Sequence, residues 1–155
     1  MTLGAIKNFI DELGKHKMLV YFVILWGAML FLWTLYGIIE WGFELSGALG
    51  FLDMLYHLSE LFAGLLLILV GIKLMKPDFF AMIKNEKLTI YFLLLWAGSF
   101  FFGGLYDIVD HGPWLFEYWN CWLAFLGGLA ALFGGVALGL FSWKMMTASE
   151  EKPAQ

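Results

Sequence analysis

Charged side chains divide the chain into long apolar runs. The uncharged stretches Met18–Ile39, Leu88–Tyr106 and Tyr118–Trp143 contain 22, 19 and 26 residues. A helix needs about 20 residues to cross the ~30 Å hydrocarbon core of a bilayer. The pattern therefore predicts three membrane-spanning helices.

A fourth span is predicted from a shorter run. Leu61–Ile72 has only 12 uncharged residues, but a helix extended back to Met54 takes in His57 and Glu60 and becomes long enough to cross. The four predicted spans are about 18–40, 54–75, 88–109 and 118–142. All nine lysines then lie on one side of the membrane, and the positive-inside rule predicts that both termini are cytoplasmic.

Composition agrees with a membrane protein. Hydrophobic residues make up 62% of the 155 residues, charged residues 14%, and the mean hydropathy is +0.81. The segments between the spans are too short for a folded soluble domain, so we expect no appended catalytic module, and any activity must lie within the helix bundle or at its ends. The single cysteine, Cys121, excludes an intrachain disulfide.

The N-terminal segment has the pattern of an amphipathic helix. Its apolar residues, Leu3, Ile6, Phe9, Ile10 and Leu13, repeat at helical spacing, with Lys7, Asp11 and Glu12 on the opposite side. This pattern predicts a helix lying in the cytoplasmic membrane interface. The expected organisation is an amphipathic segment (1–16), a transmembrane hairpin (17–75), a cytoplasmic loop (76–87), a second hairpin (88–143) and a cytoplasmic tail (144–155).

An internal repeat relates the two hairpins. Residues Lys17–Gly42 placed over Lys87–Gly112, at an offset of 70, give ten identities in 26 positions. The following helices align more loosely, with Phe62, Gly64, Leu67 and Lys73 over Phe133, Gly135, Leu138 and Lys144. The expected fold is thus an all-α, four-transmembrane-helix bundle built from two parallel hairpin repeats, related by a twofold axis along the membrane normal.

Small residues recur along the fourth span. They are Gly127, Ala131, Gly135 and Gly139, at four-residue spacing. Small side chains let another backbone approach closely, so the stripe predicts tight helix packing. The spacing leaves open whether the neighbour is a helix of this bundle or a helix of a partner.

The side opposite the lysines is acidic. It contains seven carboxylates and no lysine: Glu40, Glu44, Asp53, Glu60, Asp107, Asp110 and Glu117. A D-x-x-x-H spacing occurs twice, which places an aspartate and a histidine on one helix face in each case. Together the two elements offer six candidate metal ligands: Asp53, His57, Glu60, Asp107, Asp110 and His111. Nitrogen and oxygen donors suit zinc, copper, iron or manganese.

Two simpler interpretations of these residues stay open. Asp53 could be a helix N-cap, and Asp107 with His111 could be a solvated helix end. Conversely, His57 and His111 could be axial ligands of one haem b near the outer face.

Glu60 is the most informative of the polar residues. It precedes Lys73 by thirteen residues, or ~20 Å along a helix, which puts it about 10 Å inside the hydrocarbon core. An ionisable group at that depth is costly and is expected to be functional or paired. We expect His57 as its partner, and a hydrogen bond with Tyr56 is the structural alternative.

Two function classes follow. The first is a small non-catalytic, accessory subunit of a larger membrane complex, packing through glycine-rich helix faces. The alternative is a metal- or haem-binding redox or transport protein with its acidic and histidine site near the extracytoplasmic face. The expected partners are the lipid bilayer, other membrane subunits and a basic extracytoplasmic protein, with no nucleic acid.

Overall fold

The computed structural model describes residues 3–42, 47–79, 83–114 and 118–150, and all regular secondary structure in these ranges is helical. The helices are α1 (Leu3–Lys15), α2 (Lys17–Trp41), α3 (Gly47–Met75), α4 (Asn85–His111) and α5 (Trp119–Glu150), with a 3-10 turn, η1 (Gly112–Trp114), after α4. Four of them, α2 to α5, are long and apolar enough to cross a membrane. The prediction of an all-α chain with four membrane-spanning helices is confirmed at this level.

The long helices extend beyond the predicted spans. α3 begins at Gly47, so Asp53 lies inside this helix and is not its N-cap. α4 continues through Asp107 to His111 before the turn of η1. α5 runs on past Lys144 to Glu150, into the segment expected to be a tail.

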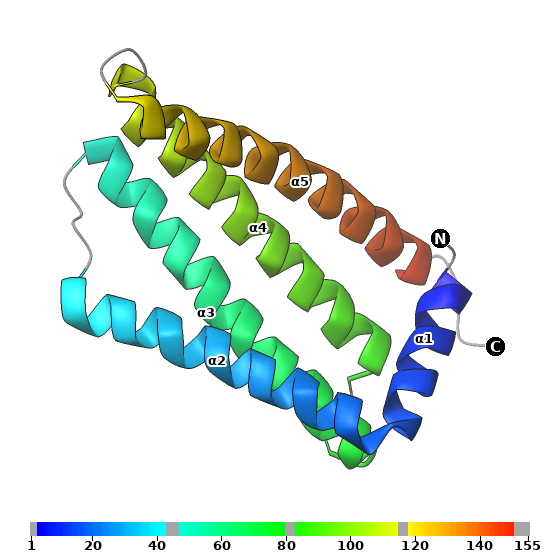
Figure 1. The fold of residues 1–155 in the computed structure, drawn as a ribbon. Helices are drawn as coiled ribbons and strands as arrows, with labels where there is room; N and C mark the ends of the chain where they lie inside the picture. Colours follow the sequence, from blue (N-terminus) through cyan, green and yellow to red (C-terminus); the bar gives the residue numbers. More distant parts are fainter. Residues whose placement is uncertain (1–2, 43–46, 80–82, 115–117, 151–155) are drawn as a thin grey trace.

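The four long helices pack in the order of the sequence. α2 packs on α3, α3 on α4 and α4 on α5, and Figure 1 shows them side by side in this order. A twofold axis exchanging the hairpins would give α5 and α2 a contact equivalent to that of α3 and α4. The described residues of α2 and α5 have no such extensive contact, so the expected twofold rotation is wrong.

Glycines set the close approach within each hairpin. A Cβ on Gly64 of α3 would lie 2.7 Å from the backbone nitrogen of Phe31 on α2. A Cβ on Gly135 of α5 would lie 2.7 Å from the backbone nitrogen of Phe101 on α4. Neither position can take a side chain without separating the helices.

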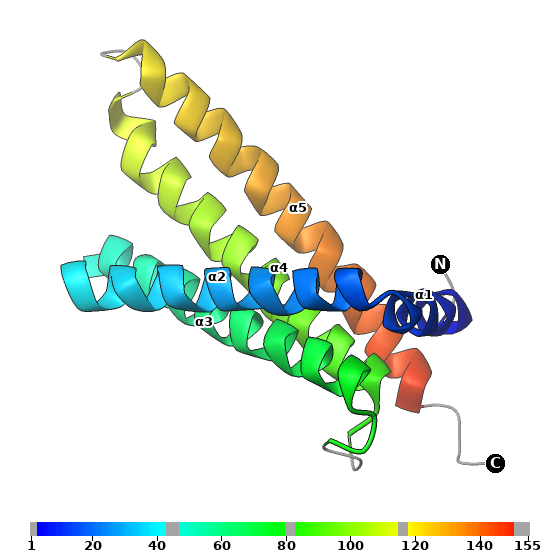
Figure 2. The same ribbon diagram turned by 60° about the horizontal axis from the view of Figure 1, so that its bottom comes forward.

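α1 closes one end of the row. Its Ile10 is 4% exposed and packs with Ile90 of α4 and Met145 of α5, while Asp11 and Glu12 are exposed. Ile10 thus contacts protein, not only the membrane interface expected for this segment. At the opposite end the α2–α3 and α4–α5 hairpins diverge (Figure 2).

The end closed by α1 is also where lysines gather. α2 and α4 begin there and α3 and α5 end there, which brings together Lys15, Lys17, Lys73, Lys76, Lys84, Lys87 and Lys144. Lys73 is 6% exposed and donates a hydrogen bond to the carbonyl oxygen of Ile83, beyond the end of α3. We call this the lysine-rich end.

Candidate functional site

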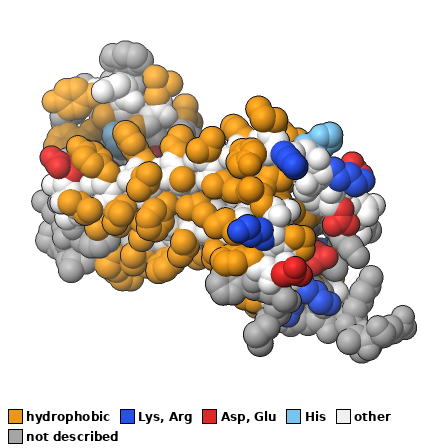
Figure 3. Space-filling model, turned by 90° about the horizontal axis from the view of Figure 1, so that it is seen from below, with side chains coloured by type: hydrophobic (Ala, Val, Ile, Leu, Met, Phe, Trp, Pro, Cys, Tyr) orange, Lys and Arg blue, Asp and Glu red, His pale blue; other side chains and the backbone are white. Residues whose placement is uncertain are grey.

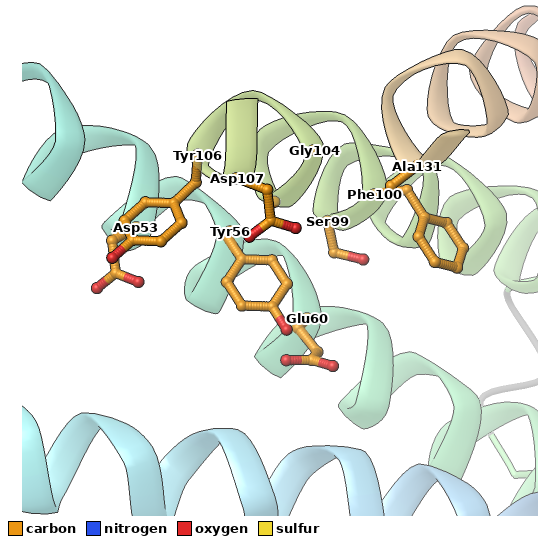
Figure 4. Close-up of a pocket in the computed structure, with 10 residues that line it drawn as sticks. Asp53, Tyr56, Glu60, Ser99, Phe100, Gly104, Tyr106, Asp107 and Ala131 are labelled. Carbon is orange, nitrogen blue, oxygen red and sulfur yellow. The ribbon is translucent and has the colours of Figure 1, made fainter. Parts of the chain in front are cut away.

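A cavity of about 330 Å³ lies between α3 and α4, toward the end where the hairpins diverge. Its polar lining comes from Asp53, Tyr56, Glu60, Ser99, Tyr106 and Asp107, and Phe100, Gly103, Gly104 and Ala131 complete it (Figure 4). The ring of Tyr56 lies against the bare backbone of Gly103, where a Cβ would be 3.1 Å from Tyr56 Cδ2. The carboxylates predicted at Asp53, Glu60 and Asp107 therefore line one cavity, which we call the acidic cavity.

Glu60 takes its hydrogen bond from a neighbouring helix. The hydroxyl of Thr34 on α2 donates to Glu60 Oε2 at 3.0 Å, and Thr34 is only 1% exposed. The Tyr56 hydroxyl, one turn along α3, is also hydrogen-bonded to Glu60 and lies beside it in Figure 4. The expected Tyr56 alternative is thus present, and Thr34 is a partner that the sequence pattern did not indicate.

His57 pairs with Asp53 instead of Glu60. Its Nε2 lies 3.3 Å from Asp53 Oδ1, one turn earlier on α3. Its Nδ1 is buried and has no hydrogen-bond partner in the described part of the chain. His57 does not line the acidic cavity, so the expected His57–Glu60 pair is wrong in this structure.

The residues of the second D-x-x-x-H element line two different cavities. Asp107 faces the acidic cavity, whereas Asp110 and His111 line a separate space of about 400 Å³ with Trp114, Tyr118, Asn120 and Cys121. The Nδ1 of His111 is 3.2 Å from the carbonyl oxygen of Asp107, one helical turn back, and 3.7 Å from Asp110 Oδ2.

This division weakens the case for a shared metal site. No group of three or more His, Cys, Asp and Glu side chains in the described ranges lies close enough to hold a metal ion. The acidic cavity is lined by neither of the two histidines proposed as haem ligands, and His111 lines the other space. The carboxylates come together, but the histidines do not join them.

The small residues of α5 belong to two faces. Gly135 packs on α4, Gly139 lies near Ala97, where the Cβ distance would be 3.8 Å, and Ala131 lines the cavity. At the cavity end the close contact is made by Gly128, whose Cβ would be 2.9 Å from the carbonyl oxygen of Gly104. A Cβ on Gly127 would meet nothing within 4 Å, so Gly127 takes no part in the packing of α5 on α4.

A second stripe of small residues faces away from the other helices. Gly127, Ala130, Gly134 and Ala137 are all exposed, and Cβ atoms on the two glycines would meet nothing within 4 Å. Their spacings of three, four and three residues keep them on one side of the helix. We call this the outer face of α5.

Comparison with models of protein families, with curated proteins and with solved structures finds no match for this chain.

Proposed function

We propose that the chain is a small non-catalytic subunit of a membrane assembly, and that the outer face of α5 is where it packs against another membrane-spanning helix. The observation that carries the proposal is the exposure of Gly127, Ala130, Gly134 and Ala137 along one line of α5. A helix that meets only lipid gains nothing from small residues in register. Helix association in membranes depends on the close approach that such residues allow.

A larger side chain on the outer face tests this proposal. Gly134→Leu should reduce the apparent mass of the assembly extracted gently from native membranes, because Leu fills the space that a neighbouring helix needs. Val136→Leu is the matched control, since Val136 is exposed on α5 but lies off the line of small residues. An unchanged mass in Gly134→Leu would refute packing through this face.

The two hairpins are, in this proposal, copies of one packing unit. Supporting this, Phe31 and Phe101 correspond at the offset of 70, and each receives the glycine of the following helix in the same way. The Cβ distances to their Cα atoms would be 3.1 Å from Gly64 and 3.1 Å from Gly135. Gly64 and Gly135 correspond in the looser alignment of the second helices.

A second candidate function is the binding of a cation in the acidic cavity. The observation that favours it is that Asp53, Glu60 and Asp107 line the same cavity, and that none of the described residues lining this cavity is a lysine. In a membrane, carboxylates are stabilised by a proton, a cation or hydrogen-bond donors, of which Thr34 and Tyr56 supply two for Glu60. The tyrosine rings would add a favourable face for an organic cation.

Cation binding is testable with matched carboxylate variants. Protein in lipid nanodiscs would be titrated with sodium, calcium or tetramethylammonium chloride, while tryptophan and tyrosine fluorescence is recorded. Glu60→Gln and Asp107→Asn should abolish a saturable response. Glu40→Gln, at an exposed carboxylate near the end of α2, should retain it. A response that persists in both cavity variants would exclude this site.

A further inference from the structure

In the repeat alignment, the face of α3 that packs on α4 corresponds to an exposed face of α5. Tyr56 of α3 lies on Gly103, and Ser59 lies near Gly98, where the Cβ–Cβ distance would be 3.6 Å. Ala63 is fully buried in a cluster with Phe92 of α4. In the repeat alignment, with its offset of 71 for these helices, the three α3 residues correspond to Gly127, Ala130 and Gly134. These are the small residues of the outer face of α5.

The α4 side of the same interface has its counterpart on α2. Gly103, Gly98 and Phe92 correspond, at the offset of 70, to Trp33, Ala28 and Phe22. Trp33 is 69% exposed and Phe22 is 61% exposed. They belong to a broad apolar surface on the side of the molecule where α2 lies (Figure 3).

Side-chain size is complementary across these two uncovered faces. Within the chain, the large Tyr56 on α3 meets the small Gly103 on α4. In the corresponding pair the sizes are exchanged, because α2 carries Trp33 and α5 carries Gly127. A large ring that faces a glycine fills the space that the glycine leaves, which is the condition for close packing.

We propose that the outer face of α5 binds α2 of a second copy of this chain, head to tail, in the geometry by which α3 binds α4 within one copy. Trp33 of one copy then lies over Gly127 of the next, and Phe22 lies over Gly134. This contact rests on the proposed function of the outer face of α5, and it makes a second copy of the chain the partner. Each copy keeps one free α2 and one free α5, so the contact is heterologous and repeats until a ring closes.

Cysteine cross-linking tests the pairing directly. The pair that corresponds to Gly98 and Ser59 is Ala28 and Ala130, and a Cβ–Cβ distance near 3.6 Å suits a disulfide. Two differently tagged proteins, one Ala28→Cys and one Ala130→Cys, both in a Cys121→Ser background, would be reconstituted together and oxidised. We expect a cross-linked heterodimer from the mixture and none from either variant alone.

The experiment has one positive and one negative control. Ser59→Cys with Gly98→Cys in one chain should form an intrachain disulfide and shows that oxidation works. Ile39→Cys mixed with Ala130→Cys should give no product, since Ile39 lies eleven residues, or ~16 Å, along α2 from Ala28. A dimer from either single variant alone would indicate a twofold contact and overturn the proposal. The absence of a cross-linked product from the mixture would also overturn it.

Native mass spectrometry separates this inference from the proposed function. We expect purified protein to form oligomers, and Gly134→Leu to lower the ratio of oligomer to monomer at least tenfold, with Val136→Leu unchanged. A purified protein that is monomeric but belongs to a larger particle in native membranes would refute self-association and leave the accessory-subunit proposal standing. A monomer in both settings would refute both.

Discussion

Thr34 donates a hydrogen bond from α2 to the carboxylate of Glu60 on α3, with 3.0 Å between Thr34 Oγ1 and Glu60 Oε2. This bond ties the two helices of the first hairpin together. Thr34→Val keeps the shape of the side chain and removes the donor. It should lower the free energy of unfolding in detergent or bilayer by about 1 kcal/mol, within the range for hydrogen bonds between membrane helices.

Thr34→Ser is the matched control for this prediction, because it retains the hydroxyl. It should recover most of the stability lost in Thr34→Val. Equal stability of Thr34→Val and the unmodified protein would mean that the bond contributes nothing measurable.

Gly135 and Gly64 should tolerate substitution equally badly. A Cβ at either position would lie 2.7 Å from a backbone nitrogen of the facing helix, so the helices must separate. We expect Gly135→Ala and Gly64→Ala each to cost about 1–3 kcal/mol of stability, the range typical of overpacked sites. Denaturation of the purified protein in mixed micelles measures this cost.

Gly127→Ala provides the comparison within α5. A Cβ at Gly127 meets nothing within 4 Å in one copy of the chain, so the monomer should lose no stability. If Gly127→Ala destabilised monomeric protein as strongly as Gly135→Ala, the division of α5 into a packed face and an outer face would be wrong.

Ile10 should be necessary for holding α1 against the long helices. Ile10→Ala removes the side chain that fills the space between Ile90 and Met145, which typically costs about 2–5 kcal/mol for a buried isoleucine. Faster amide hydrogen exchange in residues 3–15 would report the loss. Asn8→Ala, at an exposed position of α1, should leave exchange unchanged, and similar rates in both variants would argue against the contact.

The lysine-rich end should lie in the cytoplasm. The positive-inside rule gives this orientation, because the described lysines are found at that end. In a Cys121→Ser background, Pro113→Cys in η1 should react with an impermeant maleimide added to intact cells. Asp78→Cys, beyond the end of α3, should react only after the cells are opened. The reverse pattern would invert the topology and place the acidic cavity toward the cytoplasm.

The apolar runs were sufficient to predict the number of long helices, since an uncharged stretch of about 20 residues has few alternatives to a membrane span. Including Glu60 in the shorter run gave the right helix, α3. The partner of Glu60 was harder to predict, because spacing along one helix says nothing of what the next helix presents. Thr34 stands out in the sequence as a threonine within the first apolar run. Whether it reaches Glu60 depends on how α2 and α3 pack.

The glycines of α5 that pack on α4 were also hard to predict, because a four-residue spacing does not keep residues on one face of a helix. A four-residue spacing advances by about 40° more than a full turn at each step, so Gly127 and Gly139 differ by about 120° around α5. They cannot both face α4 squarely. Gly128 and Gly135, seven residues apart, differ by only about 20° and do face it. Helical geometry would have favoured this pair before any coordinates.

The position of α1 at one end of the row has a mechanical consequence. Ile10 packs on Ile90 and Met145, which both belong to the α4–α5 hairpin, and Leu74 of α3 packs against the same cluster, so the two hairpins meet at the lysine-rich end and diverge toward the other end. Each hairpin is held together as one unit by its own glycine contacts, at Gly64 in the first hairpin and at Gly135 in the second. A rotation of one hairpin against the other about this cluster would change the width of the cavity between Glu60 of α3 and Asp107 of α4.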